Sequence, residues 1–119
     1  MAYDNNNVFA KILRGEIPCQ KILETEFSLA FNDIAPQSPT HILVIPKGAY
    51  VDFQDFSANA SDVEITDYIR TIGLIAKEAG VETNGYRLIA NIGEHSGQEV
   101  PHLHFHICGG RPLGVMLQK

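Results

Sequence analysis

The sequence contains no tryptophan and only two cysteines, Cys19 and Cys108, among its 119 residues. The two cysteines lie far apart and match no Cys-x-x-Cys pattern of the kind found in metal-binding and redox sites. An unpaired cysteine is more often a small buried side chain than a reactive one. We therefore interpret both residues as reduced, partly buried thiols.

Basic residues are also scarce. Nine Lys and Arg stand against 14 Asp and Glu, which gives a net charge of −5 and an isoelectric point of about 5.4. Binding to duplex DNA or RNA would need a basic face, and the sequence contains no cluster of Lys and Arg. We predict no nucleic-acid partner. A small anionic ligand is still compatible, because one site can be locally positive on an acidic protein.

Long apolar runs are absent as well. No segment approaches the ~18 apolar residues of a membrane span, and residues 1–7 lack the basic and apolar regions of a signal peptide. We expect a cytoplasmic protein with no membrane partner. The length predicts a single domain over residues 1–119, and a hydrophobic content of 45% supplies a core.

The apolar pattern predicts a short helix, three strands, a long helix and two further strands, in that order. Asn6 or Asn7 can cap the short helix, and Gly15 is placed to end it. The long helix, Ser61 to Ala79, begins with the capping pair of Ser61 and Glu64. The predicted strands cover residues 21–25, 27–32, 40–46, 86–91 and 102–108. Short consecutive strands with helices set apart predict an α+β domain on an antiparallel sheet, one face of which the long helix covers.

The last strand is the most informative segment, because it holds three of the five histidines. It reads His102-Leu103-His104-Phe105-His106-Ile107-Cys108. Side chains alternate between the faces of a strand, so all three imidazoles would line one face and the apolar residues would line the other. Histidine titrates near neutral pH and can act as a base, an acid, a nucleophile or a metal ligand.

Three interpretations of these histidines stay open at this point. A zinc site could take two of them, since residues two apart on a strand are separated by roughly 6.6–6.8 Å, and would need His41 or His95 as a further ligand. Solvated surface histidines are the second possibility. The third is nucleophilic catalysis at phosphorus, which the flanking glycines favour because their N–H groups can approach phosphate oxygens.

The histidine segment resembles the H-φ-H-φ-H-φ-φ signature of the histidine triad (HIT) superfamily, in which φ is an apolar residue. The resemblance extends from Val8-Phe9 to Pro112. Further segments that agree in order and spacing are Ile17-Pro18, residues 29–34, residues 36–41 and residues 44–47. Gly109-Gly110-Arg111 is similar to the nucleotide-binding branch, the purine nucleoside phosphoramidases, whereas the dinucleoside polyphosphate hydrolases depart from it there.

The resemblance implies a catalytic group of four histidines. His104 matches the nucleophile that attacks the α-phosphorus and becomes nucleotidylated. The backbone carbonyl of His102 would hold one ring nitrogen of His104, so that the other faces phosphorus. His106 would donate to the phosphate oxygens. His41 matches a member of the proton-handling network, in a position beside His102.

The resemblance also implies a set of substrate-binding residues. Asp33 would bind both ribose hydroxyls through its two acceptor oxygens, although a simple turn residue before Pro36 is the alternative. The purine would lie in an apolar slot formed by Val8, Phe9, Phe31 and Ile34, for which plain core packing is the alternative. The phosphate would be contacted by Asn91, Gly97 and the backbone of Val100.

Some positions depart from the pattern of the resemblance. Glu99 stands where some relatives carry a serine that helps at the phosphate and the leaving group. A carboxylate suits a phosphate poorly, and it could instead meet a cationic leaving amine. Pro101 stands where others have an aromatic residue, and His95 matches no catalytic position. Residues 113–119 belong to a region that reaches the partner subunit's site in relatives.

The fold implied by the resemblance is HIT-like: a five-stranded antiparallel sheet with two helices, in a homodimer whose sheets join into one of ten strands. The implied activity is hydrolysis of purine nucleoside 5′-phosphoramidates, or acyl-adenylates such as aminoacyl-AMP, to the nucleoside monophosphate through a nucleotidyl-histidine intermediate. The partner would be an AMP- or GMP-like nucleotide, with no cofactor and no metal. Two alternatives stay open, a dinucleoside polyphosphate hydrolase and a nucleotide-binding or interaction module with incidental hydrolysis.

Overall fold

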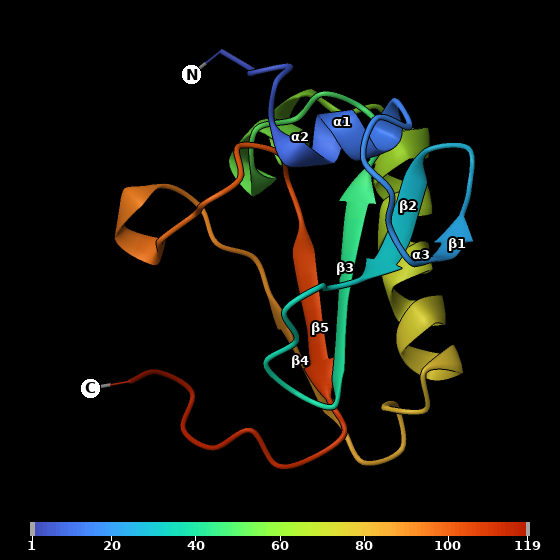
Figure 1. Ribbon diagram of the computed structural model, residues 1–119, viewed down its shortest axis with the longest axis vertical. Helices are drawn as coiled ribbons and strands as arrows, with labels where there is room; N and C mark the ends of the chain where they lie inside the picture. Colours follow the sequence, from blue (N-terminus) through green and yellow to red (C-terminus); the bar gives the residue numbers. More distant parts are fainter. Residues whose placement is uncertain (1, 119) are drawn as a thin grey trace.

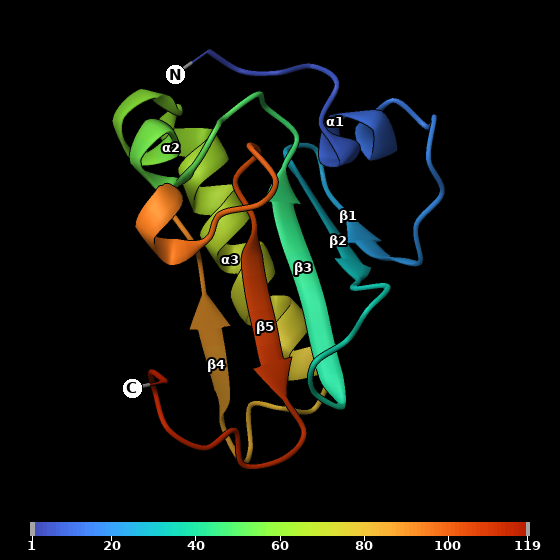
Figure 2. The ribbon, with the colours of Figure 1, turned by 60° about the vertical axis from the view of Figure 1, so that its left-hand side comes forward.

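The computed structural model describes residues 2–118, which form a five-stranded antiparallel sheet with helices on both faces (Figures 1 and 2). The strands are β1 (Lys21–Glu24), β2 (Ser28–Asn32), β3 (Thr40–Pro46), β4 (Tyr86–Ile89) and β5 (Phe105–Gly109), in the order β1-β2-β3-β5-β4. The helices are α1 (Val8–Leu13), α2 (Phe53–Asn59), α3 (Asp62–Glu78) and the 3₁₀ turn η1 (Glu94–Ser96). The predicted α+β class and the five-stranded antiparallel sheet are confirmed.

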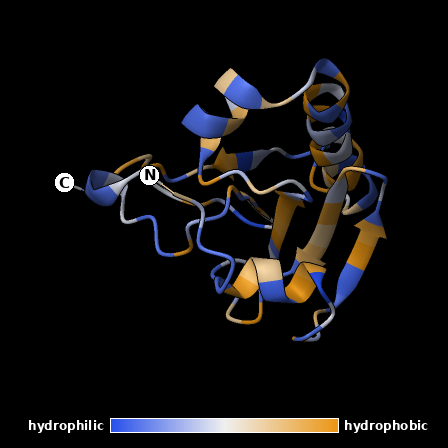
Figure 3. Cartoon of the chain, turned by 90° about the horizontal axis from the view of Figure 1, so that it is seen from above, coloured by the Kyte–Doolittle hydropathy of each residue, from blue (hydrophilic) through white to orange (hydrophobic). Residues whose placement is uncertain are grey.

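The sheet buries both of its faces, and each face has its own core. Alternate residues of the central strands, such as Ala30 and Val44, pack with the buried side of α3. Their neighbours Phe31 and Leu43 pack on the opposite face with Phe9 of α1. In Figure 3 the strands are accordingly mostly in hydrophobic colours, whereas the helices carry both colours. Because α1 is only six residues long, it covers one end of its face of the sheet (Figure 1).

The long helix forms as the sequence predicts. Ser61 is its N-cap and exchanges hydrogen bonds with Glu64 in a complete capping box, and Ala79 is its C-cap. Gly80 follows with a φ of +78°, a conformation that favours glycine. Tyr68, Ile72 and Ile75 recur on one side and are buried against the sheet.

A third α-helix, α2, was not among the two that the sequence predicted, so the expected number of helices was wrong. The side chain of Asp52 caps it by accepting from the backbone N–H of Asp55. Phe56 is its only buried residue. A seven-residue helix with a single buried side chain has no recurring apolar stripe, and periodicity therefore cannot reveal it.

The histidine segment is only partly a strand, which corrects the prediction that all of it lies in one. The β3–β5 ladder ends at the pair of Val44 and Phe105, so His102 and His104 precede the strand. Their segment bends away because its backbone bonds to loops instead, with Leu103 N–H donating to the Tyr50 carbonyl. The apolar residues of the alternation nevertheless pack into the α3-side core, as predicted.

Among residues 2–118, no helix is both long and apolar enough to cross a membrane. The cytoplasmic location stays a prediction. Both cysteines are free, with Cys108 buried and Cys19 partly buried, in agreement with the expected thiols.

Candidate functional site

The histidines meet on the α1 side of the sheet, around the start of β5. His106 pairs with Leu43 across the β3–β5 ladder, and His41 lies two residues before Leu43 on the same face. The register therefore makes His41 and His106 diagonal neighbours, within reach of each other's rings. The ring of Phe9 packs edge-on against that of His104, with centroids 4.9 Å apart, and closes this face from the side of α1.

His104 has the hydrogen-bonding pattern of a nucleophile. Its Nδ1 lies 2.7 Å from the backbone carbonyl of His102. A carbonyl only accepts, so Nδ1 carries the proton and Nε2 keeps its lone pair. Burial lowers the pKa of His104, although the His102 carbonyl and the charges of Asp33 and Glu99 act in the opposite direction. The ring is therefore neutral near pH 7, with Nε2 able to attack an electrophile.

His102 supports this arrangement from the interior of the protein. Its ring is fully buried, and Nε2–H donates to the carbonyl of Pro46 at 2.8 Å. Nδ1 is left to accept a hydrogen bond, and the hydroxyl of Tyr3 supplies it. Burial lowers the pKa of His102 to about 4, so this ring also stays neutral. Both nitrogens are occupied, and His102 is accordingly an anchor rather than a nucleophile.

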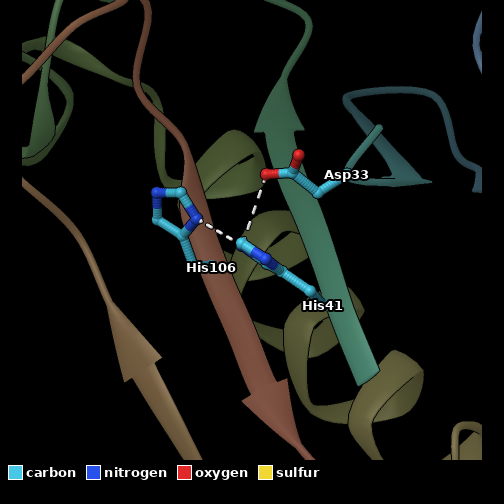
Figure 4. A group of neighbouring side chains, drawn as sticks. All are labelled: Asp33, His41 and His106. Carbon is cyan, nitrogen blue, oxygen red and sulfur yellow. Dashed lines mark hydrogen bonds and ion pairs between the residues drawn. The ribbon is translucent and has the colours of Figure 1, made fainter. Parts of the chain in front are cut away.

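Asp33, His41 and His106 form a relay in which His41 hydrogen-bonds His106 and lies close to the carboxylate of Asp33 (Figure 4). The backbone N–H of Gln37 donates to Nδ1 of His41 at 3.0 Å, so Nε2 of His41 carries its proton. Nε2–H of His41 donates to Nδ1 of His106 at 2.9 Å, and the same nitrogen lies 3.3 Å from the carboxylate of Asp33. His106 consequently bears its own proton on Nε2.

With its proton on Nε2, His106 can donate a hydrogen bond to a ligand bound beside its ring. Burial, together with the neighbouring imidazoles of His104 and His41, lowers the pKa of His106 to about 4. The ring is therefore neutral near pH 7, yet it offers an N–H. His104 and His106, with ring centroids 5.1 Å apart, thus present one lone pair and one proton side by side.

The resemblance placed His41 beside His102, and the structure corrects this. His41 hydrogen-bonds His106, and the ring of His102 bonds Tyr3 and Pro46. The cause is the strand register, because His106 is the histidine that pairs with β3 beside His41. His102 lies before the ladder begins.

The three side chains of the relay could also be considered as a metal site. The ligand atoms of Asp33, His41 and His106 lie within 4.8 Å of one another. A histidine that binds a metal usually donates its other N–H to a carbonyl or carboxylate. The other nitrogen of His41 instead accepts from the N–H of Gln37, so ligation through Nε2 would leave the ring without a proton. The geometry favours a proton relay over a metal centre.

The glycine-containing loop before His102 is held in one shape by the side chain of Gln98. Its amide oxygen accepts from the N–H of Gly93, and its amide nitrogen donates to the carbonyls of Val51 and Val100. Gly97 adopts a φ of +77°, a left-handed conformation that a side chain would disfavour. The loop ends with Glu99 exposed and with Val100 packed on the α1-side core.

The residues of the predicted purine slot lie partly in the core and partly at the surface. Phe9 and Phe31 are buried and pack edge to face, with ring centroids 5.7 Å apart. Val8 is 38% exposed, and Ile34 is 94% exposed in the turn after β2. Asp33 belongs to the same turn, where one carboxylate oxygen accepts from the N–H of Ala35.

Two residues of the site were missed by sequence reasoning, Tyr3 and Gln98. Tyr3 lies in a polar segment with no periodic pattern, and a hydrogen bond across 99 residues leaves no local signal. The position of Gln98 between Gly97 and Glu99, two predicted site residues, could have drawn attention to it. Asn91, a predicted phosphate contact, lies partly buried just after β4, and its role stays a prediction.

Comparisons with known proteins identify relatives of this chain. The family described as "HIT domain" matches residues 14–113. A HIT-like protein of Azospirillum brasilense is 62% identical over 98% of this chain and 96% of its own. The purine nucleoside phosphoramidase of Escherichia coli K12 is 44% identical over 92% of both chains. A HIT family hydrolase from Clostridium thermocellum superposes with a TM-score of 0.86 and 35% identity, covering 97% of this chain and 99% of the other.

Proposed function

This chain belongs to the HIT family, and from that premise we propose that it hydrolyses purine nucleoside 5′-phosphoramidates, or related acyl-adenylates, to the nucleoside monophosphate. The purine nucleoside phosphoramidase of E. coli, at 44% identity, supports this choice within the family. One observation carries the proposal, namely the complementary protonation of His104 and His106. An unprotonated Nε2 stands next to an N–H donor, in a site where burial keeps both rings neutral.

In the proposed reaction, Nε2 of His104 attacks the α-phosphorus and forms a phosphorus–nitrogen bond to the enzyme. The bond between phosphorus and the leaving amine breaks, and the amine departs with a proton from the imidazole network of His41 and His106. Nε2–H of His106 donates to a phosphate oxygen and stabilises the charge that gathers there in the transition state. Water then attacks phosphorus, breaks the nucleotidyl-histidine bond and releases the nucleoside monophosphate, and the proton that the water loses returns to the imidazole network.

We assign the nucleoside to the neighbouring turn and helix. A carboxylate has about four acceptor sites. Asp33 uses one for Ala35 and lies 3.3 Å from His41 through its other oxygen, so acceptor capacity remains for the two ribose hydroxyls. The purine would lie against Phe9, Val8 and Ile34, with Phe31 as buried support beneath them.

The phosphate and the leaving group are assigned to the other side of His104. Asn91, Gly97 and the backbone of Val100 would border the phosphate, in the loop that Gln98 braces. Glu99 is exposed and acts electrostatically on His104, so its carboxylate would meet a cationic amine more favourably than an anionic leaving group. No metal takes part in this reaction.

We also propose that the chain forms a homodimer through the β4 edge of the sheet. The edge strand β1 carries a register irregularity, and its Glu24 carboxylate is held by Lys21 and Lys47. Such features protect an edge from pairing. The other edge strand, β4, instead exposes Tyr86 and Leu88. Pairing of two β4 strands would join the sheets into one of ten strands.

The reaction is tested by incubating the wild-type protein and the His104→Ala variant with adenosine 5′-phosphoramidate and measuring AMP. We expect AMP from the wild type and a loss of at least about 1,000-fold in the variant, because the nucleophile is removed. His95→Ala is the matched control, since His95 lies exposed in η1 and should retain full activity. Quenching in alkaline denaturant should capture AMP bonded to the wild-type protein and not to the variant, because the phosphorus–nitrogen bond to histidine hydrolyses in acid.

Three outcomes would contradict the proposal. Faster cleavage of a dinucleoside polyphosphate than of any phosphoramidate would make the protein a polyphosphate hydrolase. Tight AMP binding without turnover would make it a binding module. Loss of activity on treatment with a chelator, restored by zinc, would overturn the metal-free mechanism.

A further inference from the structure

Tyr3 reaches the site from a part of the chain in which the sequence predicts no functional residue. Figures 1 and 2 show the segment before α1 running across the end of the sheet where β3 ends and β5 begins. The Tyr3 hydroxyl hydrogen-bonds Nδ1 of His102, and the two rings meet edge to face with centroids 5.5 Å apart. The contact joins residues that are 99 positions apart in the chain.

The hydroxyl of Tyr3 completes the hydrogen bonding of a ring that has no access to water. Nε2–H of His102 donates to the Pro46 carbonyl, so Nδ1 is an acceptor and Tyr3 is its donor. The side chain of His102 is fully buried. Without the hydroxyl, Nδ1 would lack a partner or change its protonation, and both changes are unfavourable for a buried polar atom.

The ring of His102 matters for catalysis because of the carbonyl on the same residue. That carbonyl accepts from Nδ1–H of His104 and thereby keeps the proton away from Nε2. The peptide group of this carbonyl lies before β5, so the hydrogen bonds of the sheet do not fix its position. Its position depends on the ring of His102 and on two backbone bonds, from His102 N–H to Val100 and from Leu103 N–H to Tyr50.

We propose that Tyr3 is a positioning residue for the nucleophile. By donating to Nδ1 of His102 it fixes that ring, and with it the carbonyl that orients His104. The inference rests on the proposed function, in which His104 attacks phosphorus. Tyr3 acts through His102 and does not contact the substrate in this arrangement.

The kinetic test is the Tyr3→Phe variant, which removes the hydroxyl and keeps the ring. We expect the single-turnover rate of nucleotidyl transfer to fall about 2- to 10-fold, the range that one neutral hydrogen bond contributes, while KM changes less than about twofold. Tyr68→Phe is the matched control, because it removes a hydroxyl that donates to the Val44 carbonyl on the α3 side of the sheet and should keep the wild-type rate. A role in packing alone predicts the wild-type rate for Tyr3→Phe as well.

A second measurement follows the imidazole ¹⁵N signals of the free protein by NMR. In Tyr3→Phe, the Nδ1 signal of His102 should shift as it loses its donor, and a larger fraction of His104 should carry its proton on Nε2. Unchanged ¹⁵N signals together with an unchanged rate would overturn the proposal. If the wild type hydrolyses no phosphoramidate, the proposed function fails, and the signals still decide whether Tyr3 fixes the two rings.

Discussion

The four histidines of the site differ in the partners of their ring nitrogens, although the sequence presents three of them as equal members of one alternation. His102 has both nitrogens bound within the protein, His104 has one held by a carbonyl, and His106 has one held by a second imidazole. The free nitrogen of His104 is an acceptor and that of His106 is a donor. The division of roles therefore follows from hydrogen bonding rather than from the residue type.

Because the fold keeps these imidazoles neutral, we expect the protein to become less stable to unfolding in acid. The pKa values of His102 and His106 fall to about 4 in the folded protein, below the ordinary value of 6.5. The unfolded chain therefore binds more protons than the folded one as pH falls below 6.5, and stability decreases with each step towards pH 4. Between pH 7 and 5 we expect a loss of about 2 kcal/mol from His102, and less from the more exposed His106.

The prediction is checked by urea denaturation at pH 7, 6 and 5, a range above the ordinary titration of carboxylates. His106→Asn should have a smaller loss between pH 7 and 5 than the wild type, because one of the suppressed protonations is removed. His95→Ala should lose as much as the wild type, since His95 lies exposed. A wild-type stability that is constant from pH 7 to 5 would mean that these rings titrate normally.

At the scale of elements, the sequence predicts those parts that repeat a pattern. The strand at residues 40–46 and the capped helix after Ser61 are found where they were predicted, since buried runs and capping boxes are local signals. The helix α2 was missed because only Phe56 of its seven residues is buried. The start of β5 at Phe105 was missed because a continuing alternation does not show where the pairing with the partner strand begins.

In the site, too, contacts between residues close in the sequence were predicted, whereas contacts between distant segments were not. The hydrogen bond from His104 to the carbonyl of His102 joins residues two apart, and the resemblance to a known family predicted it. The partner of His41 depends on the register between β3 and β5, which the sequence does not specify. The contact of Tyr3 depends on the path of a polar segment over the finished fold.

The helix α1 packs one buried side chain against the nucleophile. Phe9 is 6% exposed, and its ring packs on the rings of His104 and Phe31. We expect Phe9→Leu to lower the free energy of unfolding by about 1 kcal/mol. The single-turnover rate should fall several-fold, because the ring of His104 loses a packing contact that restricts its orientation.

Ile45→Val is the matched control for this element. Ile45 is fully buried in the same core cluster as Phe9, and the substitution should cost about 1 kcal/mol of stability. The rate should stay at the wild-type value. Chemical denaturation measures the stability of each variant, and AMP release measures its rate. Equal rates in the two variants would show that Phe9 serves the core alone.

At the scale of the whole molecule, the two edges of the sheet differ in their readiness to pair. The chain past β5 returns beside β4, where the guanidinium of Arg87 donates to the carbonyls of Gly114 and Val115. Val115, Met116 and Leu117 are more than 70% exposed along this segment. An apolar tail and an edge strand with exposed Leu88 thus lie on one side of the molecule, which favours association there.

Introducing one lysine at each edge of the sheet tests which edge forms the dimer. Leu88 on β4 is 44% exposed, and Ile22 on β1 is 39% exposed. If the chain pairs through β4, Leu88→Lys should convert a dimer into a monomer at micromolar concentration, because a lysine at the centre of the joint sheet would be buried without a partner. Ile22→Lys should remain a dimer. Sedimentation velocity gives the mass, and circular dichroism confirms that both variants are folded. A monomeric wild type, or a dimer that survives Leu88→Lys and dissociates with Ile22→Lys, would contradict pairing through β4.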